Sequence, residues 1–279
     1  MDWLIMTAIN YAKLPITWFF FATGAVIGSF LNVCILRIPE GTFWAHARSV
    51  CPACKSPIPF YLNVPILSFL WLRGRSRCCK QSLSMLYPTI EVLTGALFVL
   101  LYWKFPFIDL SGSSLQIQPD QWIRWLHSAV LTSVLVVCSA IDFRLMIIPD
   151  VISLPMIAVV PGVVFLHPEL DWFSALAGVL AGGGSLYLVA WIYWVWKRKA
   201  GLGMGDVKLL AFIGGWLGYQ AIFPTILVGS VLGAMVGLVL LLRSSGFTLK
   251  SALPFGPFLA IGAWIQLIAG QWLQIWIGG

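Results

Sequence analysis

Two aspartates, Asp142 and Asp206, are the residues of this 279-residue sequence whose type and setting most clearly indicate chemistry. Only ten acidic residues occur in the chain, and these two border long apolar stretches, where an ionisable side chain is costly enough to indicate function. Two carboxyl groups at one depth on different helices can share a proton, so that one acts as base and the other as acid on a water molecule. The pair therefore predicts peptide hydrolysis by an aspartic protease mechanism.

Two glycines, Gly203 and Gly205, lie just before Asp206. Glycine removes side-chain bulk and widens the choice of backbone dihedral angles, so we expect this loop to let a substrate backbone approach the carboxyl group. Both aspartates also have structural interpretations, Asp206 as the N-cap of the following helix and Asp142 as a solvated helix end. Asp150, which precedes the next apolar stretch, is predicted to cap a helix.

Four of the six cysteines lie in one polar insertion, as Cys51 and Cys54 in a CxxC pair and then as the adjacent Cys78 and Cys79. Four thiolates around Zn²⁺ stabilise loops too small to bury a core of their own, so this spacing predicts a structural zinc knuckle. Four protein ligands leave no open position for a substrate. Adjacent cysteines need an unusual turn to bind one ion, so the spacing leaves open whether Cys78 and Cys79 are both ligands.

The elements that must position these groups follow from composition. The chain is 60% hydrophobic and 10% charged, with a mean hydropathy of +0.92, which excludes an ordinary water-soluble domain. Since about 20 helical residues cross a bilayer core, we predict an all-α polytopic membrane protein with about eight transmembrane helices. The predicted spans are Leu14–Ile38, Leu86–Trp103, Trp125–Ile141, Val151–Leu166, Trp172–Trp194, Val207–Leu217, Ala221–Leu242 and Ala252–Ile277.

The spans divide the chain into three predicted segments. Residues 1–38 form the first transmembrane helix, residues 39–85 a cytosolic subdomain with the possible zinc site, and residues 86–279 a transmembrane protease core. A second polar stretch, Phe105–Arg124, is rich in turn-forming residues and is expected to be an external loop. The run from Gly182 to Gly184 predicts close helix packing or a flexible point, of which packing is favoured. Glu91, within the second span, is interpreted either as pairing with a cation or as facing the site.

The positions of the cations predict the orientation in the membrane, because Lys and Arg near span ends are kept on the cytoplasmic side. With the N-terminus outside, all of the 17 Lys and Arg residues fall in inside segments except Lys13, Lys104 and Arg124. The net charge of +7 is therefore interpreted as a topology signal and not as a sign of nucleic-acid binding. Both termini are then outside, and both aspartates and the cysteine subdomain are on the cytoplasmic side.

Short motifs spread along nearly the whole chain support the interpretation as a membrane-embedded aspartic protease. They are Gly28-Ser29-Phe30-Leu31-Asn32-Val33 with Arg37 and Pro39, Cys51-Pro52-x-Cys54, Asn63-x-Pro65-Ile66-Leu67-Ser68, Leu72-Arg73-Gly74, Tyr87-Pro88-x-x-Glu91, Asp142 with Ile148-Pro149-Asp150, and Gly203-x-Gly205-Asp206-Val207-Lys208. In combination they resemble the prepilin peptidase family, the GxGD-type aspartyl proteases and N-methyltransferases of type IV pilus and type II secretion systems. One departure is that Ser76 stands where the family usually has the first cysteine of a second CxxC pair. The resemblance therefore supports Cys79 as the third zinc ligand and supports Cys78 least.

The resemblance implies a reaction and a location. Asp142 and Asp206 would be the catalytic pair, which cuts the short basic leader of a type IV prepilin or pseudopilin on the cytoplasmic face of the bacterial inner membrane. The new N-terminal residue would then be methylated with S-adenosylmethionine, while the hydrophobic stem of the substrate lies among the spans and membrane lipids. Zn²⁺ would be a structural ion at the cysteines. No glycine-rich nucleotide fingerprint follows a strand, so the sequence does not locate a site for S-adenosylmethionine.

Two other functions stay open at this stage. The altered cysteine set is compatible with a monofunctional prepilin peptidase that lacks methyltransferase activity. A proton-coupled transporter also uses paired carboxylates within a helical bundle, although a carrier places them near the bilayer midplane more often than at one edge.

Overall fold

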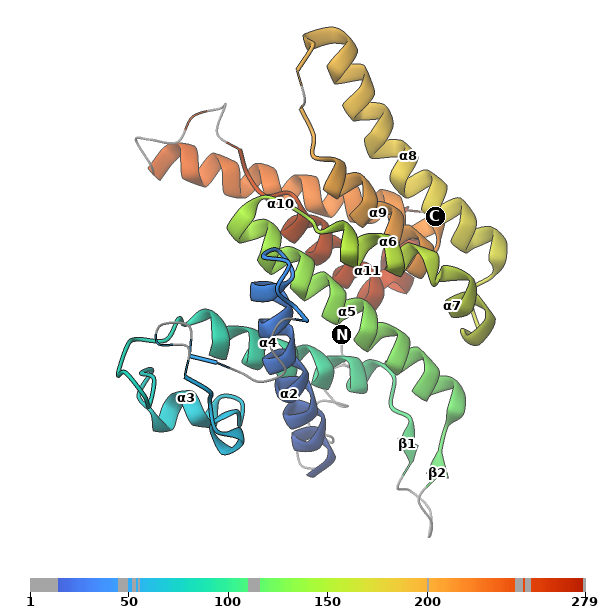
Figure 1. The fold of residues 1–279 in the computed structure, drawn as a ribbon. Coiled ribbons are helices and arrows are strands. Elements are labelled where there is room, and N and C mark those ends of the chain that lie inside the picture. The colour runs from blue at the N-terminus through green and yellow to red at the C-terminus, as the bar shows by residue number, and fades with distance from the viewer. Residues whose placement is uncertain are drawn as a thin grey trace. The chain divides into compact units, whose positions relative to one another are not determined.

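The computed structural model describes residues 15–44, 50–51, 54, 56–109, 116–199, 201–243, 248 and 252–277 (Figure 1). Nearly all of its regular structure is helical, and the chain forms two compact units, which we call unit 1 (Met1–Val137) and unit 2 (Cys138–Gly279). The division falls within one long helix, and the three segments predicted from the sequence stay a prediction. Lys13 lies outside the described residues.

Unit 1 contains two long helices that pack side by side, α2 (Pro15–Arg37) and α4 (Leu86–Lys104). Glycines permit the close approach. A Cβ on Gly24 would lie 2.7 Å from the carbonyl oxygen of Thr94, and one on Gly28 would lie 2.8 Å from the Cα of Glu91. Helices in a membrane associate through such small residues because lipid supplies no hydrophobic force between them.

An aromatic cluster joins the beginning of α2 to the end of α4. The rings of Phe20 and Tyr102 stack with centroids 4.1 Å apart, and Phe107 and Trp125 pack against Phe20 edge-on. Next to this cluster, strands β1 (Ile108–Asp109) and β2 (Gln116–Ile117) pair antiparallel.

The polar stretch Phe105–Arg124 was predicted to be a loop throughout, and this prediction was wrong at its end. Helix α5 (Pro119–Leu145) already begins at Pro119. Proline at the first helical position loses no intrahelical hydrogen bond, and Asp120 in the first turn interacts favourably with the helix dipole. Residues 110–115 of the stretch lie outside the described residues.

Unit 2 begins with the end of α5 and continues through six more α-helices. These are α6 (Asp150–Ala158), α7 (Val160–Leu166), α8 (Trp172–Lys197), α9 (Met204–Leu217), α10 (Ile222–Arg243) and α11 (Gly256–Ile277). The single span predicted over Val151–Leu166 is instead two short helices that meet at Val159. Pro161 follows this junction and lacks the N–H that a continuous helix would use.

Close glycine contacts join α8 to α9, as the glycine run predicted. A Cβ on Gly178 would lie 2.0 Å from the carbonyl oxygen of Gly214, and one on Gly182 would lie 2.4 Å from that of Leu210. The backbones therefore touch, and no larger side chain fits at these positions.

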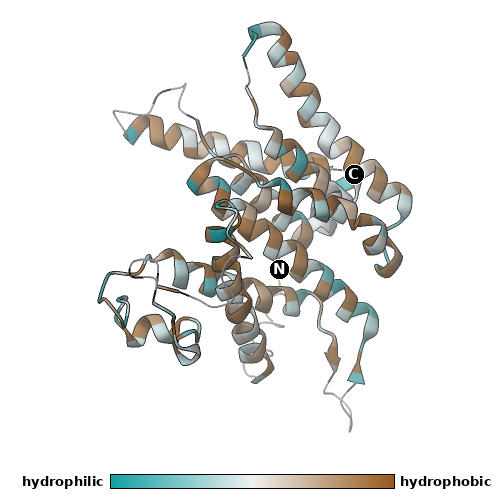
Figure 2. Cartoon of the chain, in the orientation of Figure 1, coloured by the Kyte–Doolittle hydropathy of each residue, from teal (hydrophilic) through white to brown (hydrophobic). Residues whose placement is uncertain are grey.

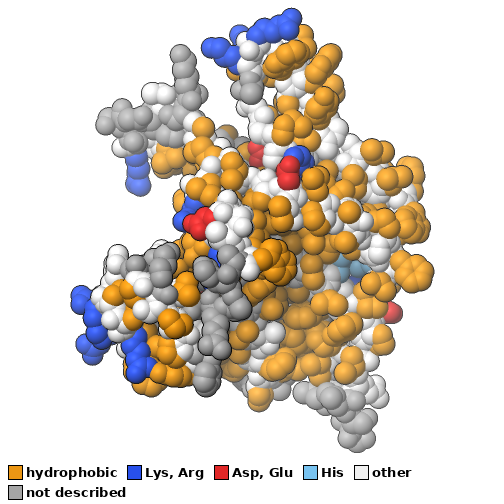
Figure 3. Space-filling view, viewed as in Figure 1, with side chains coloured by type: hydrophobic (Ala, Val, Ile, Leu, Met, Phe, Trp, Pro, Cys, Tyr) orange, Lys and Arg blue, Asp and Glu red, His pale blue; other side chains and the backbone are white. Residues whose placement is uncertain are grey.

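Among the residues that the structure describes, five helices are long and apolar enough to cross a membrane: Pro15–Arg37, Leu86–Lys104, Pro119–Leu145, Trp172–Lys197 and the Tyr219–Arg243 segment that contains α10. Helices α8 and α10 are coloured mostly in the hydrophobic half of the scale in Figure 2, and many of their apolar side chains are exposed. Apolar side chains cover much of the visible surface (Figure 3). Helix α9 has 14 residues, fewer than the roughly 20 that a perpendicular crossing needs. The structure thus identifies a helical membrane protein, and the count of eight spans stays a prediction.

Candidate functional site

Asp142 lies near the end of α5, and its side chain is only 5% exposed. It is therefore not the solvated helix end that one interpretation offered. One of its oxygens, Oδ2, accepts a hydrogen bond of 2.9 Å from the N–H of Gly256. Gly256 is the first residue of α11, where unpaired N–H groups and the positive end of the helix dipole favour a carboxylate. A Cβ on Gly256 would lie 2.8 Å from this oxygen, so glycine is needed for the contact.

Asp206 lies in the first turn of α9 and is 9% exposed. The helix begins one residue after Gly203, which is its N-cap and makes no side-chain capping bond. The interpretation of Asp206 as the N-cap was therefore wrong. The charge of the Asp142 carboxyl group acts on Asp206, so the two side chains lie within electrostatic reach of each other in unit 2. The fold thus brings together the two aspartates that the sequence singled out.

The two glycines before Asp206 have different surroundings. Gly203 has an extended backbone with φ of −71°, which any residue can adopt, and a Cβ there would lie 3.3 Å from Oδ2 of Asp206. A Cβ on Gly205 would lie 2.9 Å from the Cβ of Ile148. The bulk that Gly205 lacks is thus replaced by Ile148 of the protein itself. The approach of a substrate along this loop stays a prediction.

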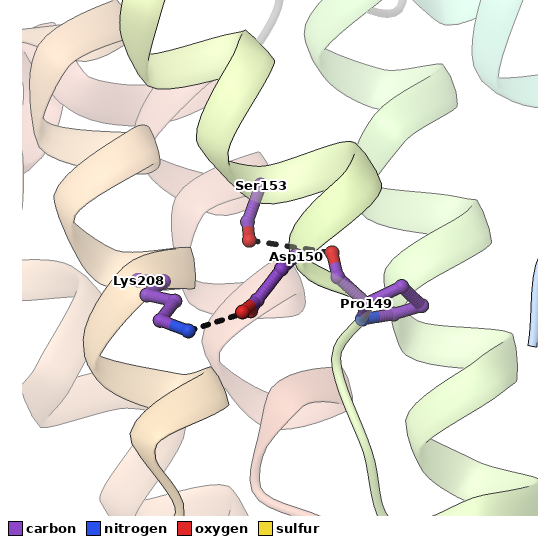
Figure 4. Close-up of polar contacts among 4 residues, drawn as sticks. All are labelled: Pro149, Asp150, Ser153 and Lys208. Carbon is purple, nitrogen blue, oxygen red and sulfur yellow. Dashed lines mark hydrogen bonds and ion pairs between the residues drawn. The ribbon is translucent and has the colours of Figure 1, made fainter.

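Contacts between α6 and α9 hold the Asp206 segment in place. Asp150 was predicted to cap a helix, but the N-cap of α6 is Pro149, and Asp150 instead accepts a 2.6 Å hydrogen bond from Nζ of Lys208 (Figure 4). The Ser153 hydroxyl donates to the Pro149 carbonyl at 3.3 Å. At the other end of α9, the indole N–H of Trp216 donates to the carbonyl of a residue in α6 at 2.9 Å.

Three positioning residues were not identified from the sequence, namely Gly256, Ile148 and Lys208. Ile148 and Lys208 belong to motifs that were noted, but nothing in a local pattern says that they contact the other motif. For Gly256 the available signal was Pro257, because proline in the first turn marks a helix start. A helix start facing a buried aspartate was not deducible without the fold.

These groups can perform acid and base chemistry. Two nearly buried carboxyl groups that interact electrostatically cannot both ionise readily, so a pair of this kind can share a proton and act as a unit. Deprotonated, one carboxylate can take a proton from water, and the other carboxyl group can donate a proton to a leaving group.

The four cysteines of the insertion form a second cluster, within unit 1. Their sulfur atoms all lie within 4.8 Å of one another, with 3.7 Å between those of Cys51 and Cys79 and 3.1 Å between those of Cys54 and Cys78. Four sulfurs at about 2.3 Å from a tetrahedral zinc lie about 3.8 Å apart. The cluster fits a Zn²⁺ ion, and Cys78 points into it together with the other three.

An unusual turn lets adjacent cysteines share the cluster. Lys80, which follows Cys79, has a positive φ of 59°, and its N–H donates to the carbonyl of Ser76. The Ser76 hydroxyl lies 3.0 Å from the sulfur of Cys79, so this serine accompanies a ligand and does not replace one.

The thiols of the cluster share protons unequally. Hydrogen bonds from Ser56, and then from Cys78, lower the pKa of Cys54 to about 6. The hydrogen bond between the sulfurs of Cys78 and Cys54 is the main cause that raises the pKa of Cys78 to about 12. The lowered pKa makes the Cys54 thiolate easier to form, and thiolates are the form that binds zinc.

A membrane protein whose apolar helices bring together two buried aspartates has the architecture of an intramembrane aspartic protease. Comparison with known proteins gives the family. The family model described as Bacterial Peptidase A24 N-terminal domain matches residues 22–105, and that of the Type IV leader peptidase family matches residues 129–238. The chain belongs to the type IV leader peptidase family.

Relatives with the printed name prepilin leader peptidase/N-methyltransferase match along most of this chain. The protein of Aeromonas hydrophila is 36% identical, over 93% of this chain and 94% of its own length. That of Klebsiella pneumoniae is 38% identical, over 78% of this chain and 93% of its own length. That of Pseudomonas putida is 34% identical, over 89% of this chain and 88% of its own length. No solved structure matches the chain.

Proposed function

We propose that this chain is a prepilin leader peptidase that removes the short basic leader of type IV prepilins or pseudopilins and then methylates the new N-terminal residue. The family and the names of the relatives support both activities, and they do not favour a monofunctional peptidase or a transporter. The observation that carries the peptidase activity is the pair of nearly buried aspartates, Asp142 and Asp206, on two helices of one compact unit.

Asp142 and Asp206 are the proposed catalytic pair. The ionised carboxylate removes a proton from a water molecule, which attacks the carbonyl carbon of the peptide bond after the leader. The protonated carboxyl group then donates its proton to the leaving nitrogen as the carbon–nitrogen bond breaks. The proton taken from water remains on the first carboxylate, so the pair again holds one proton for the next turnover.

The positioning residues keep this pair in a fixed geometry. Gly256 donates its N–H to Asp142, and the contacts of Ile148 and Asp150 with the start of α9 hold the segment that carries Asp206. Fixing the groups in advance avoids reorganisation during the reaction.

The proposed site opens to the cytoplasmic face of the bacterial inner membrane, in a chain with about eight spans and both termini outside. The distribution of cations supports this orientation. Among the described residues, Lys197, Arg198 and Lys199 stand at the end of α8, where Figure 3 shows a group of blue side chains. Further cations, Arg73, Arg75, Arg77 and Lys80, follow α3 (Leu67–Trp71) in the sequence. The hydrophobic stem of the substrate would lie among the helices and lipids.

Two cofactors complete the proposal. Zn²⁺ would be a structural ion held by Cys51, Cys54, Cys78 and Cys79, since four protein ligands fill a tetrahedral site. S-adenosylmethionine supplies the methyl group. The new N-terminal amine would accept that group, with release of a proton and S-adenosylhomocysteine.

Mass spectrometry of a prepilin incubated with the purified protein in detergent tests the proposal. The wild type should release the leader, and addition of S-adenosylmethionine should add one methyl group to the product. Asp142→Asn and Asp206→Asn should each lower the cleavage rate by at least about 10³-fold, because a carboxamide cannot transfer the proton. The matched control is Asp171→Asn, since Asp171 caps α8 by accepting from the N–H of Ser174 and asparagine caps equally well. Retained turnover in either catalytic variant would refute the assignment of the pair.

A further inference from the structure

Helix α3 of the insertion has two different faces. On one face, Ser68 and Phe69 line a cavity of about 600 Å³ within unit 1. On the other, Leu67, Leu70 and Trp71 stand at i, i+3 and i+4, a spacing that places them on one side of a helix, and they are 63%, 64% and 84% exposed. Large apolar side chains gathered on a surface indicate contact with a partner or a membrane.

The apolar surface continues before the helix begins. Val64 is 44% exposed, and its carbonyl accepts from the N–H of Ser68, so it stands one turn before α3. We call Val64, Leu67, Leu70 and Trp71 the apolar face of α3. The question is what covers this face.

A hydrogen bond places α3 at the level of the membrane. The N–H of Ile66, the residue before α3, donates to Oε2 of Glu91 at 2.7 Å. Glu91 lies in the second turn of α4, a helix that is long and apolar enough to cross a membrane. Two turns of an α-helix rise about 11 Å. The start of α3 therefore lies beside the first turns of a membrane-spanning helix, and not far out in the cytosol.

A strained turn fixes this placement. Ile66 has φ of 62° and ψ of −53°, and the N–H of Leu67 closes the turn on the carbonyl of Pro65. A β-branched residue adopts this conformation only at a cost, which surrounding contacts must offset. The hydrogen bond to Glu91 is such a contact, so the fold sets the position of α3 next to α4.

The segment that follows α2 reaches the same level. The ring of Phe43 packs edge-on against that of Phe30, with centroids 6.3 Å apart, although Phe30 lies about two turns before the end of α2 at Arg37. The chain therefore folds back along α2. This brings Trp44, which packs edge-on against Phe43 and is 91% exposed, to the edge of the membrane. Tryptophan is enriched there because its ring contacts lipid while its N–H contacts water.

The charge of the insertion fits the headgroups of anionic lipids. Residues 39–85 include six Lys and Arg residues and one acidic residue, Glu40. Four of the cations follow α3 closely and are exposed, namely Arg73, Arg75, Arg77 and Lys80. An apolar helix face next to cations is typical of a segment that lies in the membrane interface.

We propose that the apolar face of α3, together with Trp44, lies in the membrane leaflet at which α2 ends and α4 begins, and that Arg73, Arg75, Arg77 and Lys80 bind phosphate groups of its anionic lipids. The partner of this surface is thus an anionic lipid bilayer. The insertion lies partly in the membrane interface and is not a domain held in the cytosol by its two linkers. This contact requires neither leader cleavage nor methylation, so it can be tested apart from the proposed function.

Photo-crosslinking identifies what covers the apolar face. The full-length protein carries p-benzoylphenylalanine in place of Leu70 and is reconstituted with a prepilin in nanodiscs of phosphatidylglycerol and phosphatidylethanolamine. Irradiation should attach lipid, read from the mass of the intact protein, to about the same extent as a probe in place of Val26, which is 57% exposed on the membrane-spanning helix α2. A probe in place of Gln81, exposed on a polar part of the insertion, should give at least about tenfold less lipid adduct.

The competing occupants give different masses. An adduct with a second copy of the chain, or with the prepilin, would show that a protein covers the face and would overturn the proposal. Equal lipid adducts at Leu70 and Gln81 would overturn it as well. An unchanged melting temperature shows that each labelled protein is folded, and a probe in place of Leu67 repeats the test on the same face.

The identity of the attached lipid tests the role of the cations. Phosphatidylglycerol should be enriched in the Leu70 adduct over its share of the nanodisc by about threefold or more, because each cation near an anionic surface attracts it. Arg73→Gln combined with Arg75→Gln should remove most of this enrichment. Lys197→Gln combined with Lys199→Gln is the matched control, since it removes two cations outside the insertion and should keep the enrichment. Adducts that match the composition of the nanodisc in the wild type would refute binding of anionic lipid by these cations.

Discussion

The insertion of unit 1 and the helical core of unit 2 hold their functional groups by different means. In the insertion, short helices and turns with positive φ at Ile66, Arg73 and Lys80 surround four cysteines and a cavity. In the core, long helices touch through glycines, and the two aspartates lie at helix ends where they are almost fully buried. The insertion buries few apolar side chains of its own, whereas the helices of unit 2 form a packed bundle.

The difference indicates where each site obtains its stability. A loop-rich segment gains order from ligands that cross-link it, because a small apolar core cannot offset its conformational entropy. A bundle gains order from packing, which depends on shape at each contact. Changes in the insertion of unit 1 should therefore affect methylation, whereas changes in the core of unit 2 should affect leader cleavage.

The largest effect should follow loss of the proposed zinc site in the insertion. Cys51 is 1% exposed and belongs to the cluster, so Cys51→Ser should abolish stoichiometric zinc and lower the rate of methylation by at least about tenfold. Metal analysis of the purified protein and mass spectrometry of the product measure these losses.

The control for this change is Cys34→Ala, because Cys34 is buried in α2 away from the cluster. It should keep the zinc. Leader cleavage should persist in the Cys51 variant, since the aspartates belong to the other unit. Loss of cleavage to the same extent as methylation would break the comparison between the units.

Whereas Cys51→Ser should remove the proposed zinc site altogether, replacing Gly256 by alanine should leave a slowed but measurable activity. The added Cβ would lie 2.8 Å from Oδ2 of Asp142 and displace the carboxyl group from the N–H that it accepts. Misplacing a catalytic group by about 1 Å lowers the rate by about 10²-fold. Cleavage kinetics measure the rate, and binding of S-adenosylmethionine should not change.

Gly233→Ala in α10 serves as its control, because a Cβ there would make an ordinary contact of 3.4 Å with the ring of Phe258. If Gly256→Ala cleaves as fast as Gly233→Ala, the hydrogen bond to Asp142 does not position the catalytic pair.

Glycines at the contact between α8 and α9 should tolerate a larger side chain less well than a glycine of α8 outside this contact. A Cβ on Gly214 would lie 2.1 Å from the carbonyl oxygen of Gly178, so Gly214→Ala should cost about 1–3 kcal/mol and lower the melting temperature of the protein. Gly184 lies in the same helix as Gly178, and its Cβ position has no described atom within 4 Å. Gly184→Ala should be neutral or raise the melting temperature, because alanine suits a helix better. Equal melting temperatures for the two variants would contradict the role of these contacts.

The sequence predicted what depends on local composition. Apolar runs gave helices α2, α4 and α8 nearly to their ends, and the types of Asp142 and Asp206 were sufficient to single out the pair that the fold brings together. The cysteine spacing likewise predicted one cluster. These features were accessible because hydrophobicity and charge act over a few residues at a time.

Contacts between distant segments could not be predicted in this way. Asp142 meets Gly256, and Asp150 meets Lys208, across long separations in sequence. No local pattern specifies such partners, and for Asp150 a generic rule about helix caps gave the wrong role. The prediction of one continuous helix through Val159 was wrong for a related reason. An apolar run shows where a helix is favoured but not where its hydrogen bonds stop.

The ion pair between Asp150 and Lys208 should have the smallest effect. The side chains are 56% and 28% exposed, and pairs exposed to this degree contribute about 0.2–1 kcal/mol. A double-mutant cycle of Asp150→Asn and Lys208→Gln, read by thermal unfolding, should therefore give a coupling energy in this range that falls as salt is added. The pair nonetheless connects the start of α6 to the helix that carries Asp206. Its loss should therefore lower the cleavage rate by a larger factor than the small loss of folding stability alone would explain. If the rate and the stability fall in proportion, the pair is only a structural contact, and the fixed geometry of the core rests on Ile148 and Gly256 alone.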